Sequence, residues 1–311
     1  MFDLHYDLLS FCYVCYLKDD YTFLEEWKKN YRIDNVRGVV ANLYFMSIPE
    51  MKEELHPSYY RKDVSVLEMF RISTEIAKKF FPDTLFLFSI EGCDYIDIDD
   101  LEELYRLGLR NILPVWNNKN QYASGNRSDS GLTDCGKNLL DKAIQLGISI
   151  DLSHANTKSY NEIIDYIKST KKKAYVMASH SNCRSLFDHP RNLSDEEILK
   201  LKEVDGILGV VSYRLFLDHS NTSSIREKYM KHITHAVSLL GSSYVCVSSD
   251  NMDFLVDEDP FYADMPVYNY QVIGRSLLDD LNKVFSIEEC NNILYNNFKL
   301  RYDKLINKEE E

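Results

Sequence analysis

Six residues have side chains suited to metal or acid–base chemistry, and each ends a stretch of mostly apolar residues. They are His5, Asp7, Glu91, His154, His180 and Asp250. The three imidazoles, with Asp7 and Glu91, form a mixed nitrogen and oxygen set that suits zinc or another borderline divalent ion. A carboxylate such as Glu91 at the end of a buried strand is costly unless a partner neutralises it. The pattern therefore predicts a metal centre.

Each of these residues also has a simpler interpretation. A single histidine at a strand end, such as His154 or His180, is more often a hydrogen-bonded structural residue than a ligand. Glu91 could cap the helix that follows it. The joint pattern is much harder to explain in this way. The remaining histidines fit surface or structural positions, and they are His56, His219, His232 and His235. The segment 117–120, Asn-Asn-Lys-Asn, fits a polar loop.

The elements that would position the candidate site are eight expected strands, rich in β-branched and aromatic residues. Apolar runs of this kind suit parallel strands buried on both faces. The expected strands cover residues 2–7, 36–45, 84–91, 111–116, 149–154, 174–180, 207–213 and 244–250. His5 and Asp7, two apart on one strand, would point to the same face.

Helical patterns lie between most of the expected strands. Apolar residues spaced three and four apart predict helices over 66–80, 139–144 and 160–167, the first with Asp63 as its cap and the second ended by Gly147. Capping boxes begin at Ser194, Ser224 and Ser286. Eight strands with intervening helices favour a (β/α)8 TIM barrel over 1–311 as a single domain, with an open doubly wound sheet as the alternative. Function in such barrels gathers at the C-terminal ends of the strands, where the six residues fall.

Composition limits the partners. The 311 residues carry a formal net charge of −13, which argues against binding nucleic acid or anionic lipid. No leader peptide or membrane-spanning run is visible, and the seven cysteines are scattered. We therefore expect reduced thiols and a cytoplasmic protein that acts on a small molecule. The sequence leaves the oligomeric state open, a homodimer included.

Several short motifs resemble those of one enzyme family. The resemblance is to the membrane (renal) dipeptidase family, peptidase family M19, and runs from about residue 3 to 302. The motifs are Asp3-Leu4-His5-Tyr6-Asp7, Ile90-Glu91-Gly92, Leu107-Gly108-Leu109-Arg110, Gly131-Leu132-Thr133 with Gly136 and Gly147, Asp151-Leu152-Ser153-His154, Ser179-His180-Ser181 with Arg191-Asn192, and Ser249-Asp250 with Asp253. The Asp151–His154 motif and the Ser179–Asn192 motif together are highly specific.

The resemblance implies a (β/α)8 zinc metallopeptidase with two Zn²⁺ ions per chain. His5 and Asp7 would bind one ion, His154 and His180 the other, and Glu91 both. A hydroxide shared by the ions would attack the amide of a dipeptide. Asp250 would contact the bridging water or relay its proton. Arg191 would hold the free C-terminal carboxylate of the substrate.

One departure affects the substrate. The family often has a substrate-binding histidine at the end of the fourth strand, and Trp116 stands at that position here. Trp116 is therefore expected to line the substrate site, and the usual partner of the tetrahedral intermediate is missing from this position. Two other functions follow from this. The same two-metal chemistry could act on a β-lactam, lactone or other cyclic amide, or the barrel could be a catalytically inactive binding protein. The intact ligand set speaks against the last of these.

Overall fold

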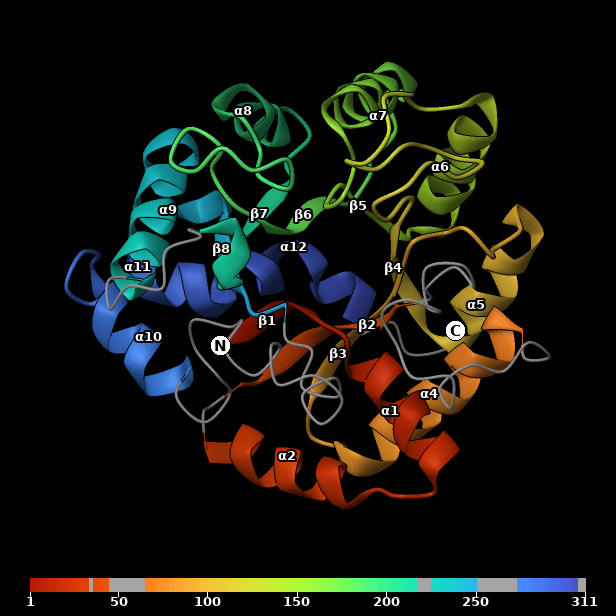
Figure 1. Cartoon of the computed structure of the whole chain (residues 1–311), viewed down its shortest axis with the longest axis horizontal. Coiled ribbons are helices and arrows are strands. Elements are labelled where there is room, and N and C mark those ends of the chain that lie inside the picture. The colour runs from red at the N-terminus through yellow and green to blue at the C-terminus, as the bar shows by residue number, and fades with distance from the viewer. Residues whose placement is uncertain (34–35, 45–64, 218–224, 251–272, 307–311) are drawn as a thin grey trace.

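The chain folds into a closed barrel of eight parallel strands, paired in sequence order from β1 to β8 (Figure 1). The structure, a computed structural model, describes residues 1–33, 36–44, 65–217, 225–250 and 273–306. The strands are β1 (Phe2–Tyr6), β2 (Gly38–Tyr44), β3 (Leu85–Glu91), β4 (Leu109–Leu113), β5 (Ser149–Asp151), β6 (Val176–Ser181), β7 (Ile207–Val211) and β8 (Val245–Ser248). This confirms the (β/α)8 barrel predicted from the sequence and excludes the open sheet.

Helices surround the barrel and connect the strands (Figure 1). The α-helices are α1 (Leu8–Lys18), α2 (Thr22–Ile33), α4 (Val66–Phe80), α5 (Leu101–Leu107), α6 (Asp134–Leu146), α7 (Thr157–Thr170), α8 (Asp195–Glu203), α9 (Ile225–Leu240), α10 (Ile273–Leu281), α11 (Ile287–Asn291) and α12 (Asn297–Ile306). Short 3₁₀ helices are η2 (Ile98–Asp100), η3 (Arg214–Phe216) and η4 (Ser242–Tyr244), and η7 (Asn292–Asn296) is a π-helix. Within the described parts of the chain, none of these helices combines the length and apolar character needed to cross a bilayer.

Local sequence signals account for several helix ends. The capping boxes at Ser194 and Ser286 open α8 and α11, and Gly147 ends α6 in a left-handed conformation. At α4 the cap is Ser65, whose side chain accepts a hydrogen bond from the Glu68 amide, in place of the expected Asp63. Other residues of the sequence predictions lie outside the described part of the chain: His56, Asp63, His219, Ser224 and Asp253.

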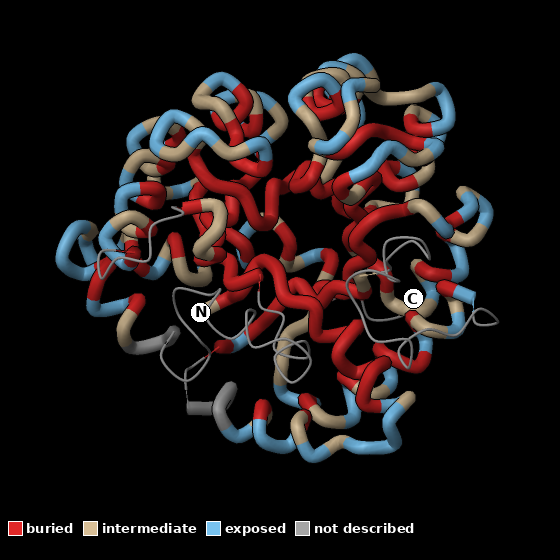
Figure 2. Tube along the Cα trace, in the orientation of Figure 1, coloured by how far each residue is buried: buried red, intermediate tan, exposed pale blue. Residues whose placement is uncertain are grey.

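The core lies between the barrel wall and the helices, so the buried chain forms an inner ring with exposed helix surfaces outside it (Figure 2). A second apolar cluster closes the N-terminal end of the barrel. There Phe298 of α12 stacks on Phe2 of β1, with ring centroids 3.8 Å apart, and Tyr302 packs beside it. Because α12 fills this end with apolar side chains, polar chemistry is left to the opposite, C-terminal end.

Several strands end earlier than the sequence predicted, although β3 ends at Glu91 as expected and β6 continues to Ser181. β5 ends at Asp151 and β8 at Ser248, so His154 and Asp250 lie in the turns that follow. β4 covers Leu109–Leu113, which leaves Trp116 in a loop. The apolar pattern continued beyond the last ladder hydrogen bond, because the first loop residues are also buried in the barrel mouth.

His232 on α9 has a structural position in this core, as expected. The Cys183 amide donates to its Nδ1 at 3.0 Å, and only 2% of the residue is exposed. Burial, with a smaller effect of His235, lowers the pKa of His232 to about 4. In the unfolded chain the pKa of His232 is near 6.5, so between pH 6.5 and pH 4 only the unfolded chain takes up the proton. The free energy of unfolding is therefore unaffected by His232 above pH 6.5 and falls as the pH drops toward 4.

His232→Asn is therefore expected to weaken the dependence of stability on pH. The asparagine keeps an acceptor near the position of Nδ1 and cannot ionise. Between pH 7 and pH 4.5 the wild type should lose about 2 kcal/mol of unfolding free energy that the variant does not lose. Denaturant unfolding at both pH values measures this, with the more exposed His235→Asn as control. Parallel pH profiles for wild type and His232→Asn would contradict the assignment.

Candidate metal centre

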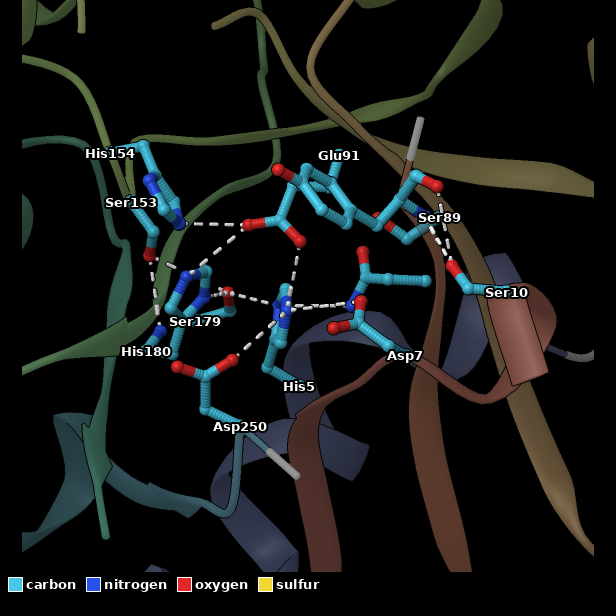
Figure 3. Close-up of polar contacts among 12 residues, drawn as sticks. His5, Asp7, Ser10, Ser89, Glu91, Ser153, His154, Ser179, His180 and Asp250 are labelled. Atoms are coloured by element: carbon cyan, nitrogen blue, oxygen red, sulfur yellow. Dashed lines mark hydrogen bonds and ion pairs between the residues drawn. The ribbon is translucent and has the colours of Figure 1, made fainter. Parts of the chain in front are cut away.

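The structure brings all six strand-end residues into one buried cluster at the C-terminal mouth of the barrel (Figure 3). Each arrives from a different strand or the turn after it, except His5 and Asp7, which share β1 and its turn. Asp7 is the residue before α1, but its side chain makes no capping hydrogen bond. Its Oδ1 lies 3.7 Å from Nε2 of His5. The carboxylate therefore serves the cluster and leaves the helix end uncapped.

Glu91 lies at the centre and faces histidines on two sides. Its Oε2 is 3.2 Å from His5 Nε2, and its Oε1 is 2.8 Å from His154 Nε2 and 3.5 Å from His180 Nε2. The next helical turn, η2, begins at Ile98 with Asp97 before it, so the interpretation of Glu91 as a helix cap is wrong. One carboxylate thus joins two groups of nitrogen atoms, as Figure 3 shows.

Backbone irregularities aim several of these side chains. Strand pairing shifts register between Asp3 and Tyr6 in β1 and between Ala178 and Ser181 in β6, the stretches that carry His5 and His180. Such irregularities redirect side chains relative to a regular pleat. His154 and Asp250 have φ angles of 70° and 51°, in the left-handed region. Non-glycine residues there are strained, so the surrounding contacts must hold them.

The electrostatics of the cluster favour added positive charge. Burial opposes a charge on His5, but Glu91, Asp7 and Asp250 outweigh it and raise its pKa to about 10. Burial, and the nearby Glu91 carboxylate, raise the pKa of Asp7 well above its usual value. Burial also raises the pKa of Asp250 to about 6, although His5 opposes the shift. Three buried carboxylates thus compete for the few positive charges nearby.

The pKa values of the two other histidines, His154 and His180, shift in the opposite direction to that of His5. Burial, reinforced by the Arg191 charge, lowers the pKa of His154 to about 3. Burial and the charge of His5 lower the pKa of His180 well below its usual value. Both rings are therefore neutral at physiological pH, and a neutral imidazole has the lone pair that a metal requires.

Buried polar atoms in the cluster indicate whether it fits metal ions. Among the described residues, three buried atoms of the cluster make no hydrogen bond of regular geometry: His5 Nε2, Asp7 Oδ1 and His180 Nε2, the two nitrogens having only their ion-pair contacts to Glu91 at 3.2 and 3.5 Å. Buried polar atoms are rarely left unpaired without a reason such as a bound ion. Their nitrogen and oxygen chemistry suits a zinc-like ion. The residues present therefore fit the metal centre that the sequence predicted.

A set of hydrogen-bonding residues around the cluster was missed by the sequence analysis. Asp3 accepts from the Ser249 amide at 2.9 Å, and Asp151 accepts from the Ser153 and Ser179 amides. The Ser179 hydroxyl lies 2.8 Å from His180 Nδ1. Asp3, Asp151 and Ser179 stand in the motifs of the family resemblance, and that signal could have identified them.

Two asparagines contact the outer nitrogens of the other histidines. Asn42 Nδ2 lies 2.9 Å from His5 Nδ1, and Asn117 Oδ1 lies 2.8 Å from His154 Nδ1. Asn42 Oδ1 has no partner among the described residues, and a half-turn of the amide would offer this acceptor to His5. Asn117 belongs to the segment interpreted as a polar loop, and nothing in its local sequence distinguishes it from Asn118.

Arg191 and Trp116 lie beside the cluster. Arg191 is buried, and its Nε has no hydrogen-bond partner among the described residues. Burial lowers its pKa to about 10, with Asp250 and Glu91 opposing, so the guanidinium stays charged at neutral pH. The Trp116 ring lies 5.8 Å from the His154 ring and 4.9 Å from the Tyr44 ring. Both predicted substrate-binding residues are therefore adjacent to the candidate ligands.

A closed parallel barrel with buried histidines and carboxylates at its C-terminal mouth defines a barrel of the metal-dependent hydrolase type. The family profile of membrane dipeptidases, peptidase family M19, matches residues 57–298, and the chain belongs to this family. A crystal structure of the M19 dipeptidase AC superposes with a TM-score of 0.75 at 19% identity, covering 98% of each chain. A metallo peptidase from Rhodobacter sphaeroides, liganded with a phosphinate mimic of L-Ala-D-Ala, gives the same values. These likenesses show the shared fold.

Curated relatives match over shorter regions. The dipeptidase verJ of Clonostachys rogersoniana is 30% identical over 154 residues, which are 48% of this chain and 38% of that protein. An uncharacterized dipeptidase of Schizosaccharomyces pombe is 29% identical over 146 residues, 46% of this chain and 34% of that protein. The chain thus spans less than two thirds of the length of these relatives.

Proposed function

We propose that this protein is a dinuclear zinc dipeptidase that hydrolyses the amide bond of a dipeptide with a free C-terminal carboxylate. The observation that carries the proposal is the two-sided position of Glu91, with Oε2 toward His5 and Oε1 toward His154 and His180. One side would hold the first zinc with His5 and Asp7, and the other the second with His154 and His180. Zinc bound there would polarise the scissile carbonyl and lower the pKa of water toward ~7.

Asp250 is proposed to move the proton from water to the leaving amine. Its Oδ1 lies 3.7 Å from His5 Nε2, and its amide donates to the His5 carbonyl at 3.1 Å. A carboxyl with a pKa of about 6 can be both proton acceptor and proton donor near neutral pH. Its left-handed backbone, held by the bond to His5, keeps the carboxylate directed into the cluster.

Arg191 is proposed to select substrates by their terminal carboxylate. A buried guanidinium with an unpaired Nε can form a charge-assisted bond to this carboxylate. A longer peptide has no free carboxylate next to the scissile bond, so it would not gain this contact. Trp116 would form an apolar wall beside the scissile bond. Family membership and the dipeptidase names of relatives support this substrate class.

We also propose that the chain works in the cytoplasm as one barrel domain. All seven cysteines are free, six of them buried. Free thiols throughout the chain fit a reducing compartment.

Removing the metal is expected to abolish dipeptide turnover and lower the melting temperature. An ion at about 1,000 times its Kd stabilises the folded state by about 4 kcal/mol, which for a chain of this size is roughly 10 °C in Tm. Metal content by mass spectrometry, thermal melting and turnover of an L,L and L,D dipeptide panel should be measured before and after chelation, and after Zn²⁺ is restored. A β-lactam and a lactone belong in the same assay. Two bound ions with cleavage of these cyclic substrates alone would replace the dipeptide assignment.

A further inference from the structure

The loop after β4 holds both the backbone and the ring of His154. The Asn126 amide donates to the His154 carbonyl at 3.1 Å, and Asn117 Oδ1 lies 2.8 Å from His154 Nδ1. Residues Gly125 and Ala155 form a bridge between the loop and the turn that carries His154. These contacts lie on both sides of a residue with φ of 70°, so they are well placed to maintain its strained conformation.

The loop is itself folded back tightly onto Asn117. The Arg127 amide donates to the Asn117 carbonyl at 2.8 Å, and the Gly125 amide donates to the Asn118 carbonyl at 3.1 Å. A Cβ on Gly125 would meet the Trp116 carbonyl oxygen at 1.7 Å, so only glycine permits this close approach. Asn117 is 9% exposed and has little freedom to leave its position.

The atom that Asn117 presents decides where the His154 proton lies. A carbonyl oxygen can only accept, so His154 Nδ1 must carry the hydrogen, and Nε2 is left with its lone pair directed at the Glu91 side of the cluster. At His180 the partner is a hydroxyl, which can donate or accept. At His5 the partners are an amide nitrogen in the present orientation and, at 3.4 Å, the Ser179 hydroxyl. His154 is therefore the ring whose tautomer is set by an acceptor alone.

We propose that Asn117 is a positioning residue for the second metal subsite, fixing the tautomer and ring orientation of His154. The inference rests on the proposed two-metal centre. Groups that hydrogen-bond to metal-binding histidines typically change metal affinity by about 10-fold to 100-fold when removed. The side-chain hydrogen bond that the structure gives Asn117 is to His154 of the second subsite, so we expect the first subsite to keep its affinity.

Metal titration of the full chain tests this without an activity assay. Apo protein is titrated with Co²⁺ and with Zn²⁺ against a competing chelator, for wild type, Asn117→Ala, Asn117→Asp and the exposed neighbour Asn118→Ala, with circular dichroism to verify folding. We expect Asn117→Ala to bind one ion as the wild type does and the other 10-fold to 100-fold more weakly. Asn117→Asp keeps an acceptor oxygen and should bind within about threefold of wild type, as should Asn118→Ala.

The outcomes separate the inference from the function on which it rests. A wild-type chain that takes up no second ion overturns the two-metal proposal, and the inference with it. Two ions bound by wild type and equally well by Asn117→Ala overturn the inference alone, as does equal weakening of both ions. If Asn117→Ala does not fold, Asn117→Asp decides, because loss of the second ion despite the retained acceptor contradicts the proposed role.

Discussion

Glu91→Gln is expected to reduce metal binding from two ions to one or none and to lower kcat/KM for dipeptides by about 10³-fold or more. Glu91 is the one described carboxylate whose two oxygens face the nitrogens of different histidines, His5 on one side and His154 and His180 on the other. Glutamine keeps the shape and one oxygen but loses the charge and replaces the other oxygen with a donor. Metal analysis and steady-state kinetics on the same preparation measure both effects.

The matched control is Glu75→Gln, because Glu75 is an exposed residue of α4 in a surface ion pair with Arg71. It should keep two ions and wild-type kinetics, since exposed ion pairs contribute little. Full metal content and unchanged turnover in Glu91→Gln would refute the bridging role. A drop in turnover with both ions retained would leave Glu91 as an acid–base residue and remove it from the ligand set.

Arg191→Ala is expected to lower kcat/KM for a dipeptide by about 10²-fold to 10³-fold, mainly through a higher KM. Losing a buried, charge-assisted contact to a carboxylate typically costs about 3–4 kcal/mol, which corresponds to this range. A dipeptide whose C-terminus is amidated cannot form the contact. Its turnover by the wild type should already be low, and the substitution should change it little.

Comparison of the acid and amide substrates isolates the contact from general damage to the site. Arg71→Ala, on the exposed face of α4, provides the control for loss of an arginine. Metal content should stay at the wild-type value in both variants, because Arg191 is not a proposed ligand. Its contact with the cluster is to the backbone carbonyl of His180, at 3.5 Å. If Arg191→Ala slows acid and amide substrates equally, Arg191 does not read the terminal carboxylate.

The barrel was predictable because its signals are local. Buried parallel strands are apolar along most of their length, as in β3 and β7, and the helices between them carry amphipathic spacing and capping boxes such as that at Ser194. Once the strands are parallel and in sequence order, their C-terminal ends must meet at one rim. The polar residues at those ends were therefore identified together, before any contact was known.

Contacts across the rim required the tertiary structure. Asn42 and His5 are separated by 37 residues, as are Asn117 and His154, and a polar loop residue has the same local sequence signal whether it contacts a histidine or solvent. The left-handed backbone of His154 likewise depends on the loop that packs against it. The sequence by itself determined the barrel and the chemical types gathered at its mouth, because periodicity and strand ends are properties of neighbouring residues. Only the folded chain decided which oxygen of Glu91 faces which histidine, and which asparagine contacts each histidine ring. Both depend on distances between segments that lie far apart in the sequence.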